Sequence, residues 1–265
     1  MQVTIPTWAR SPPRWETDAV TDIHVVAVHG NGGGSTRFDR LGTKLSDRVV
    51  LTAVDLPGFN GVPLDPDATS VPAYADRLAD RLPTDRPLVI LGHGIGGSIA
   101  LDLLSRRPEA ADGLILHAPV GAHLDSRLFP KLMSPPIVRR LVRSAISARP
   151  LRGVLHNRFF PTGVPEPHRA RFFEGYRTCE AFGLMFDIID APWFEGLEPI
   201  TEVPTRLLWG SGDRVLDAAH TAQFQEKAPN ATIDIIDGWD HFPMLEQPDE
   251  YATVIARTAA ELVDG

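Results

Sequence analysis

Six short apolar runs recur along the chain, and each ends in a turn rich in glycine, proline or polar residues. Runs of this length that stay apolar at successive positions are typical of strands buried on both faces, as in a parallel sheet. The runs occupy residues 24–29, 49–54, 88–91, 114–116, 205–209 and 233–236. Helical patterns lie between or after them, at 36–46, 70–82, 96–107, 217–228 and 248–263. This alternation predicts an α/β fold with a doubly wound, mostly parallel sheet.

The interval 120–200 breaks the alternation. It has no clear strand pattern, and its helical pieces, at 136–148 and 167–189, are separated by prolines. A structureless loop of this length is uncommon in a compact domain. We therefore expect an inserted helical lid at 120–200, and a core formed by residues 1–119 and 201–265.

Composition narrows the class of protein. The chain has 265 residues, of which 43% are hydrophobic and 23% charged, which excludes a disordered chain and a coiled coil. No apolar run reaches the roughly 18 residues of a membrane span, and the start lacks the pattern of a signal peptide. We therefore expect a cytoplasmic protein. Cys179 is the only cysteine, and no metal-ligand spacing, phosphate loop or dinucleotide fingerprint is present, so we expect no metal and no cofactor.

The charge is unevenly distributed. The formal net charge of −8 argues against nucleic acid as a partner. The lid interval is nevertheless basic, with eight Lys and Arg residues and no acid between Arg127 and Arg158. Two interpretations remain open: a solvated lid surface, or a surface that steers an anionic substrate or an acidic carrier protein toward the site.

Four turns after the predicted strands contain residues suited to catalysis. Their sequences are HGNGGG at 29–34, LGHGIGG at 91–97, WGSGD at 209–213 and GWDHFPMLEQP at 238–248. The set resembles the α/β-hydrolase-fold superfamily, in its subgroup with a helical cap after the sixth strand. The resemblance extends over roughly 23–119 and 203–262.

The resemblance implies a role for each turn. The backbone N–H groups of Asn31 and Ile95 would form the oxyanion hole, and the side-chain amide of Asn31 is a further donor there. Asp213 would be the acid that orients His241, the base. The nucleophile of the family's G-x-S-x-G elbow, however, is replaced here by Gly94. A glycine has no nucleophilic group, so no acyl-enzyme can form at this position.

Other side chains near these motifs are weaker candidates. Ser98 and Cys179 are alternative nucleophiles, and His93 flanks the elbow. Asp240 and Asp55 are alternative acids.

Three interpretations of Gly94 remain open. In the first, His241 and Asp213 act as a general base without a serine, in hydrolysis or in an elimination of the lyase type, as hydroxynitrile lyases show for this fold. In the second, a serine ester hydrolase has been inactivated by a Ser-to-Gly change at this position. In the third, the protein is a non-catalytic pseudo-hydrolase that binds a ligand.

The substrate expected from the resemblance is a small molecule with a carbonyl, ester or lactone group. The second half of the lid is strongly apolar, and we expect Phe186, Trp193 and Phe194 to contact this substrate.

Overall fold

The computed structural model describes residues 22–42, 44–84, 87–121, 124, 131–160 and 162–265, and its centre is a six-stranded sheet. All five strand pairs are parallel, and the spatial order is β2-β1-β3-β4-β5-β6. The strands are β1 (Ile23–Val28), β2 (Val49–Val54), β3 (Leu88–His93), β4 (Gly113–His117), β5 (Thr205–Gly210) and β6 (Thr232–Ile236). The predicted doubly wound parallel sheet is therefore confirmed.

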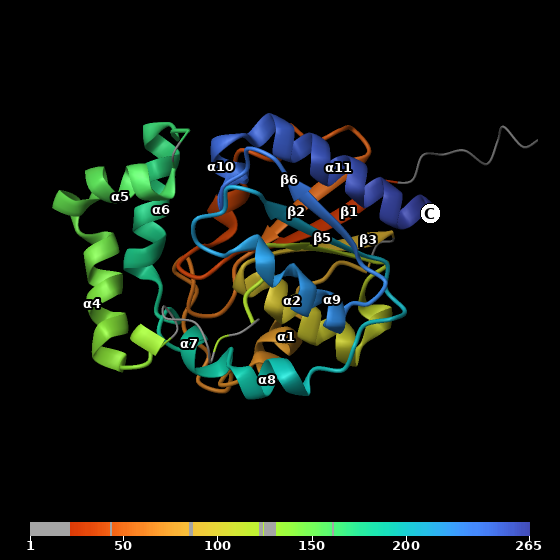
Figure 1. Ribbon diagram of the computed structural model, residues 1–265, viewed down its shortest axis with the longest axis horizontal. Helices are drawn as coiled ribbons and strands as arrows, with labels where there is room; N and C mark the ends of the chain where they lie inside the picture. The colour runs from red at the N-terminus through yellow and green to blue at the C-terminus, as the bar shows by residue number, and fades with distance from the viewer. Residues whose placement is uncertain (1–21, 43, 85–86, 122–123, 125–130, 161) are drawn as a thin grey trace, which may run out of the picture.

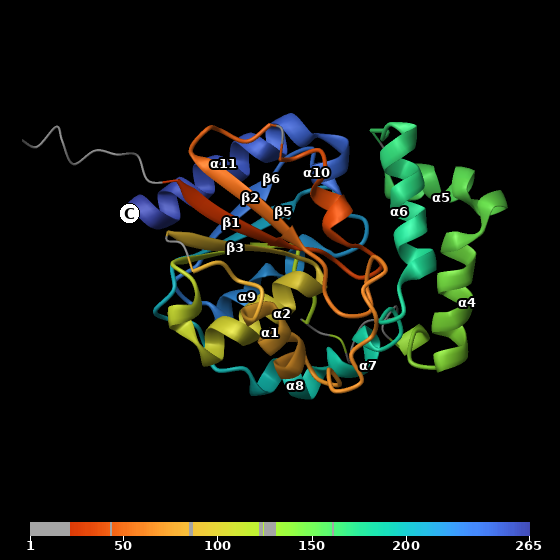
Figure 2. The same ribbon diagram turned by 180° about the vertical axis from the view of Figure 1, so that it is seen from behind.

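Helices cover both faces of this sheet (Figures 1 and 2). One face carries the C-terminal helix, α11 (Pro248–Asp264), and the short α10 (Pro243–Glu246) before it. The other carries α1 (Val71–Ala79), α2 (Ile95–Arg106) and α9 (Thr221–Lys227). Short 3-10 turns occur at Ser35–Phe38, Pro108–Ala110, Arg149–Leu151 and Ala218–His220.

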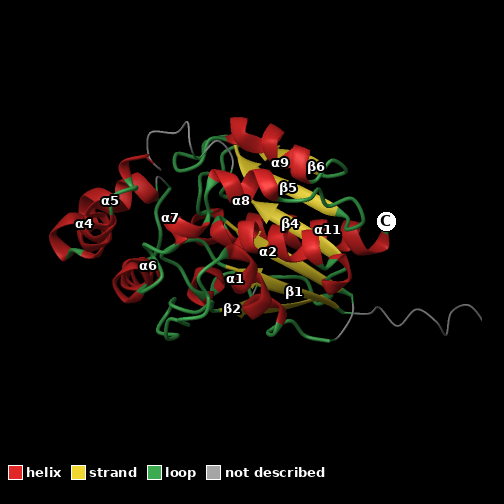
Figure 3. Ribbon diagram, turned by 90° about the horizontal axis from the view of Figure 1, so that it is seen from below, coloured by secondary structure: helices red, strands yellow, loops and turns green. Residues whose placement is uncertain are grey.

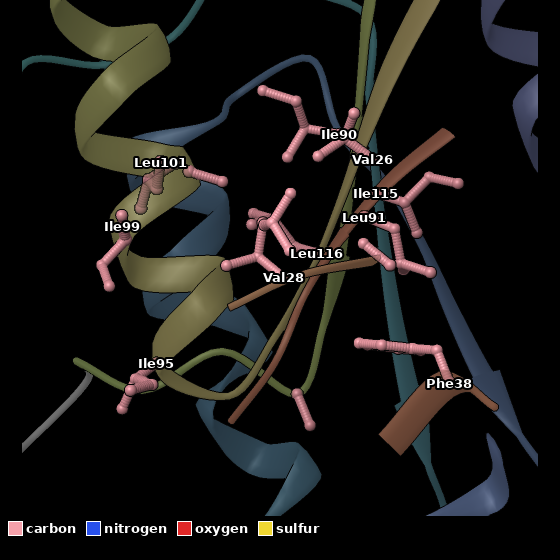
Figure 4. Close-up of a cluster of buried hydrophobic side chains, with 14 of the residues drawn as sticks. Val26, Val28, Phe38, Ile90, Leu91, Ile95, Ile99, Leu101, Ile115 and Leu116 are labelled. Atoms are coloured by element: carbon pink, nitrogen blue, oxygen red, sulfur yellow. The ribbon is translucent and has the colours of Figure 1, made fainter. Parts of the chain in front are cut away.

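The core consists of side chains that alternate between the two faces of the strands. Val28 and Leu116 point toward Ile99 of α2, while Leu91 and Ile115 point to the opposite face (Figure 4). All five side chains are fully buried. Because β3 and β4 are buried at every position, they read as continuous apolar runs in the sequence.

Among its described residues, the segment between β4 and β5 contains five α-helices and no strand. We call residues 118–204 the inserted segment. Its α4, α5 and α6 lie together at one end of the sheet in every view (Figures 1–3). The helices are α4 (Pro136–Ser147), α5 (Arg152–Phe159), α6 (Glu166–Thr178), α7 (Met185–Ile188) and α8 (Ala191–Gly196). If β1 is counted as the third strand of the family that the sequence resembles, β4 is the sixth.

Two predicted helices differ from the structure. In place of the helix predicted at 36–46, the described residues form the 3-10 turn at Ser35–Phe38, followed by hydrogen bonds from Leu41 N–H to Phe38 O and from Lys44 N–H to Leu41 O. The helix predicted at 167–189 ends at Thr178, because the backbone of the next residues forms hydrogen bonds with the loop after β2. There, the N–H groups of Glu180 and Ala181 both donate to Gly58 O, at 2.8 and 3.2 Å.

No helix in the described part of the chain is long and apolar enough to cross a membrane. The predicted cytoplasmic location and the division into core and lid stay predictions. Residues 1–21, the start of the predicted core, lie outside the described residues.

Candidate active site

A sharp turn at Gly94 joins β3 to α2 at the carboxyl edge of the sheet. Gly94 has φ 57° and ψ −120°, a backbone conformation that side chains disfavour. The flanking glycines let the turn close tightly, since a Cβ at Gly92 would lie 2.5 Å from the Cα of Gly97, and one at Gly96 would lie 2.3 Å from the carbonyl oxygen of Val28. A Cβ on Gly94 itself would meet only the Cα of Gly30, at 3.3 Å. The turn therefore has the form of a nucleophile elbow, and a side chain at Gly94 would require the backbone of Gly30 to shift by a few tenths of an ångström.

The glycine-rich turn after β1 lies beside this elbow. Gly30 packs against the ring of His93, where a Cβ on the glycine would be 3.0 Å from Nδ1. Asn31 and Ile95, the two predicted oxyanion donors, both line the cavity in front of the elbow. Ile95 is the first residue of α2, so its N–H has no acceptor within the helix. The side chain of Asn31 points elsewhere than predicted, because its Nδ2 donates to Phe182 O at 3.2 Å.

The predicted acid and base lie together. Nδ1 of His241 is 2.8 Å from Oδ2 of Asp213. A carboxylate accepts, so the proton is on Nδ1 and the basic nitrogen is Nε2. The other oxygen of Asp213 accepts the N–H groups of Val215 and Leu216, each at 2.8 Å. Burial by itself raises the pKa of Asp213, but attraction to His241 and these hydrogen bonds outweigh it, and the pKa is lowered.

Nε2 of His241 has no hydrogen-bond partner among the described residues, although His241 is buried and lines the cavity. In an elbow with a serine, this nitrogen would face the serine hydroxyl. Here Gly94 lines the same cavity and carries no hydroxyl, so Nε2 is available to water or a ligand.

Two further histidines support the loop of His241. Nε2 of His93 is 3.1 Å from the carbonyl oxygen of His241, and because a carbonyl only accepts, His93 donates. Burial and the nearby His241, His117 and Arg37 lower the pKa of His93 well below its usual value. Burial likewise lowers the pKa of His117, to about 3. Both rings are therefore neutral at pH 7 and hold the loop without adding charge.

A cavity of about 580 Å³ lies in front of the elbow and the histidine. Core residues form its floor, and apolar side chains of the inserted segment form much of its wall. The wall includes Val120, Leu124, Val142, Ile146, Phe159, Tyr176, Phe182, Met185, Phe186 and Ile189.

Of the three residues predicted to contact substrate, only Phe186 lines this cavity. The prediction is corrected for Trp193 and Phe194. The indole N–H of Trp193 donates to Asp102 Oδ1 on α2 at 3.0 Å, and Phe194 packs against Phe224 with ring centroids 5.1 Å apart. Both side chains therefore fasten α8 to the core.

The weaker candidates are bound elsewhere. Asp55 accepts from Ser35 and Asn60. Asp240 pairs with Arg214 through its Oδ2, 2.6 Å from Nε, instead of with the histidine ring.

The alternative nucleophiles are also unavailable. The hydroxyl of Ser98, in α2, donates to Val120 O of the inserted segment. Burial raises the pKa of the Cys179 thiol to about 12, so it is protonated at pH 7. Among the described residues, no group of three His, Cys, Asp or Glu side chains is placed to hold a metal.

One residue that lines the cavity, Arg37, was not among the site residues predicted from the sequence. Arg37 lines the cavity with a fully buried side chain. It belongs to the segment 36–46, which was predicted as a helix, and the only available signal was its position eight residues after His29, which begins a glycine-rich turn.

The fold agrees with comparisons to known proteins. The sequence model of the alpha/beta hydrolase family matches residues 25–254, and the chain belongs to this family of enzymes. It is 28% identical over 260 residues to an uncharacterised protein of Mycobacterium tuberculosis, covering 88% of this chain and 74% of the relative. It is 25% identical over 248 residues to a pimeloyl-[acyl-carrier protein] methyl ester esterase of Aromatoleum aromaticum, covering 87% and 96% of the two chains.

Solved structures show the same fold. An esterase from Exiguobacterium antarcticum superposes with a TM-score of 0.73 at 18% identity, over 90% of this chain and 92% of the esterase. An epoxide hydrolase from Bacillus megaterium superposes with a TM-score of 0.71 at 15% identity, over 90% and 93%. At these identities the likeness concerns the fold alone.

Proposed function

We propose that this protein acts on a small carbonyl or ester substrate by general-base catalysis, with His241 as the base and Gly94 in place of a serine nucleophile. The observation that carries the proposal is the bond of 2.8 Å between His241 and Asp213, with the basic Nε2 of His241 left unpartnered beside the cavity. A base held in this way contributes about 10²- to 10⁴-fold to a rate.

In hydrolysis, the reaction begins with a water molecule in the space left by the missing side chain. Nε2 of His241 takes a proton from this water as its oxygen attacks the carbonyl carbon. The oxyanion accepts hydrogen bonds from the N–H groups of Asn31 and Ile95. The tetrahedral intermediate then collapses, and the alcohol leaves with the proton from His241. Asp213, ionised throughout because its pKa is lowered, stabilises the protonated ring.

In elimination, the same nitrogen removes a proton next to the carbonyl group. The electron pair forms a double bond as the leaving group departs, and the two N–H groups stabilise the enolate oxygen. Both reactions need the same base and the same donors, so the substrate decides between them.

The inserted segment is proposed to act as a lid that shapes the pocket. Its apolar wall suits a hydrocarbon or acyl portion of the substrate. The relatives whose names specify an acyl-carrier-protein ester support a carrier-bound substrate as one member of this class. Of the basic residues in the segment, Arg140 and Arg149 are exposed and available to an acidic carrier. Arg139 and Arg143 donate to carbonyl groups of the segment itself, and Arg158 donates to Arg214 O at 2.7 Å.

A second candidate function is favoured by the geometry at Gly94. A Cβ there would have one close contact, 3.3 Å from the Cα of Gly30, so a small shift of that backbone would admit the serine of an ester hydrolase. On this alternative the natural chain has negligible turnover, because loss of a serine nucleophile alone costs about 10⁶-fold in kcat.

The experiment that separates these functions compares the natural chain with Gly94→Ser and His241→Ala on p-nitrophenyl acetate, butyrate and hexanoate. The proposal predicts turnover by the natural chain that falls at least 10²-fold in His241→Ala. Activity found only in Gly94→Ser supports the disabled hydrolase. Labelling of the natural chain by a fluorophosphonate contradicts both accounts.

A further inference from the structure

Arg37 is a buried cation in the wall of the cavity. Its side chain is 3% exposed, and its Nη2 donates to the carbonyl oxygen of Gly32 at 3.0 Å. Its Nη1 is buried and has no hydrogen-bond partner in the part of the chain that the structure describes. The guanidinium carbon lies 3.7 Å from the centroid of Phe172.

No carboxylate pairs with Arg37 among the described residues. The cavity offers a direct comparison in Arg139, which is also buried and lines the wall. Each guanidinium nitrogen of Arg139 donates to a carbonyl oxygen, and Nη1 also pairs with Asp187 at 2.6 Å. Arg139 is a satisfied structural arginine, whereas Arg37 has a free donor group.

Burial lowers the pKa of Arg37 to about 10, so the side chain remains charged at pH 7. Stacking on Phe172 offsets part of the desolvation, since a cation over an aromatic face is attracted to it. The two N–H bonds of Nη1 still lack acceptors, and an unpaired buried charge is strongly unfavourable.

Arg37 is also close to the proposed catalytic groups. Its guanidinium carbon is 5.5 Å from the ring of Phe242, whose centroid is 4.7 Å from that of His241. A group bound at Arg37 therefore lies next to the substrate position.

We infer that Nη1 of Arg37 binds a carboxylate of the ligand, so that the cavity selects molecules with an apolar portion and one negatively charged end. This inference rests on the proposed function only in taking the cavity as the substrate site. A dianionic phosphate would bring a second negative charge against a single buried cation, so a carboxylate fits the charge balance better.

The test measures binding and needs no turnover. Hexanoate and hexanamide have the same length and nearly the same shape, and differ in charge. Calorimetric titration of the full chain should show hexanoate binding about 10- to 100-fold more tightly, the range for a hydrogen bond to a charged group. In Arg37→Met this preference should fall to about 1, with the affinity for hexanamide unchanged.

Two further variants keep the test specific. Arg139→Met, a buried arginine of the same cavity with no free donor, should retain the preference for hexanoate. His241→Ala should retain it as well, because the carboxylate is bound by Arg37 and not by a protonated histidine. Where a methionine variant does not fold, as judged by circular dichroism, Arg37→Gln and Arg139→Gln replace the pair.

Equal binding of hexanoate and hexanamide by the natural chain, a preference that survives in Arg37→Met, or one lost in His241→Ala would each overturn the inference. If hexanoate binds through Arg37 but no ester is turned over, the inference stands and the proposed function fails.

Discussion

The substitution Gly94→Ala tests the elbow directly, because it adds a Cβ where φ is 57° and ψ is −120°. A side chain in such a sparsely populated conformation costs about 1–3 kcal/mol. Alanine has less conformational entropy than glycine in the unfolded chain, and this offsets about 0.4–1 kcal/mol of that cost. Steric crowding adds to this cost, since the new Cβ would lie only 3.3 Å from the Cα of Gly30, and that backbone must shift by a few tenths of an ångström.

The net loss of unfolding free energy should therefore be about 1–2 kcal/mol. For a chain of this size, where 1 kcal/mol shifts Tm by about 2–4 °C, that corresponds to a decrease in Tm of roughly 2–8 °C. Gly94→Ser should lose less, because its hydroxyl can donate to Nε2 of His241 and regain about 0.5–1.5 kcal/mol.

Thermal unfolding followed by circular dichroism measures these differences. Two glycines provide controls. Gly61 has φ 84° and no neighbour within 4 Å, so Gly61→Ala isolates the backbone effect. Gly96→Ala places a Cβ 2.3 Å from Val28 O and should cost more than Gly94→Ala, about 3 kcal/mol or more. The reasoning is refuted if Gly94→Ala is as stable as the natural chain while Gly61→Ala is destabilised, or if Gly96→Ala is tolerated.

Three further predictions follow from the site. Asp213→Asn should lower kcat by about 10²- to 10⁴-fold with little change in KM, since it removes the group that orients and stabilises the base; an unchanged rate would contradict the pairing. Trp193→Phe should lower Tm and leave KM unchanged, because Trp193 binds α2. Phe186→Ala should raise KM, because Phe186 lines the cavity. Steady-state kinetics and thermal melts of both variants measure these effects. Burial lowers the pKa of His29 to about 4, so the free energy of unfolding that depends on neutral His29 is present above pH 6.5 and is lost as the pH falls toward 4. In His29→Gln, the free energy of unfolding measured by urea titration should therefore decrease less over this pH range.

The residues of the proposed site could be identified from sequence because each belongs to a local turn at the end of a buried strand. Since parallel strands end at the same edge of a sheet, Gly94, Asp213 and His241 come together once the fold is correct. Asp213 and His241 are indeed in contact, at 2.8 Å, while their catalytic roles stay predictions.

The wall of the cavity could not be predicted in this way. The aromatic residues between 182 and 194 have similar patterns, but which of them face the cavity depends on how the inserted segment docks. Trp193 faces α2 because its N–H binds Asp102, a contact between residues 91 positions apart in the sequence. Arg37 was missed for the same reason, since only the tertiary fold shows that its side chain is buried among Phe172, Tyr176 and Phe242.

The central claim is that the natural chain turns over an ester through His241 without a covalent intermediate. The most direct test is the intact-protein mass of the natural chain, quenched during turnover of p-nitrophenyl hexanoate. The account predicts release of p-nitrophenol with no protein carrying an added hexanoyl group, and no release above background in His241→Ala. A hexanoyl adduct on the natural chain, or undiminished release in His241→Ala, would contradict it.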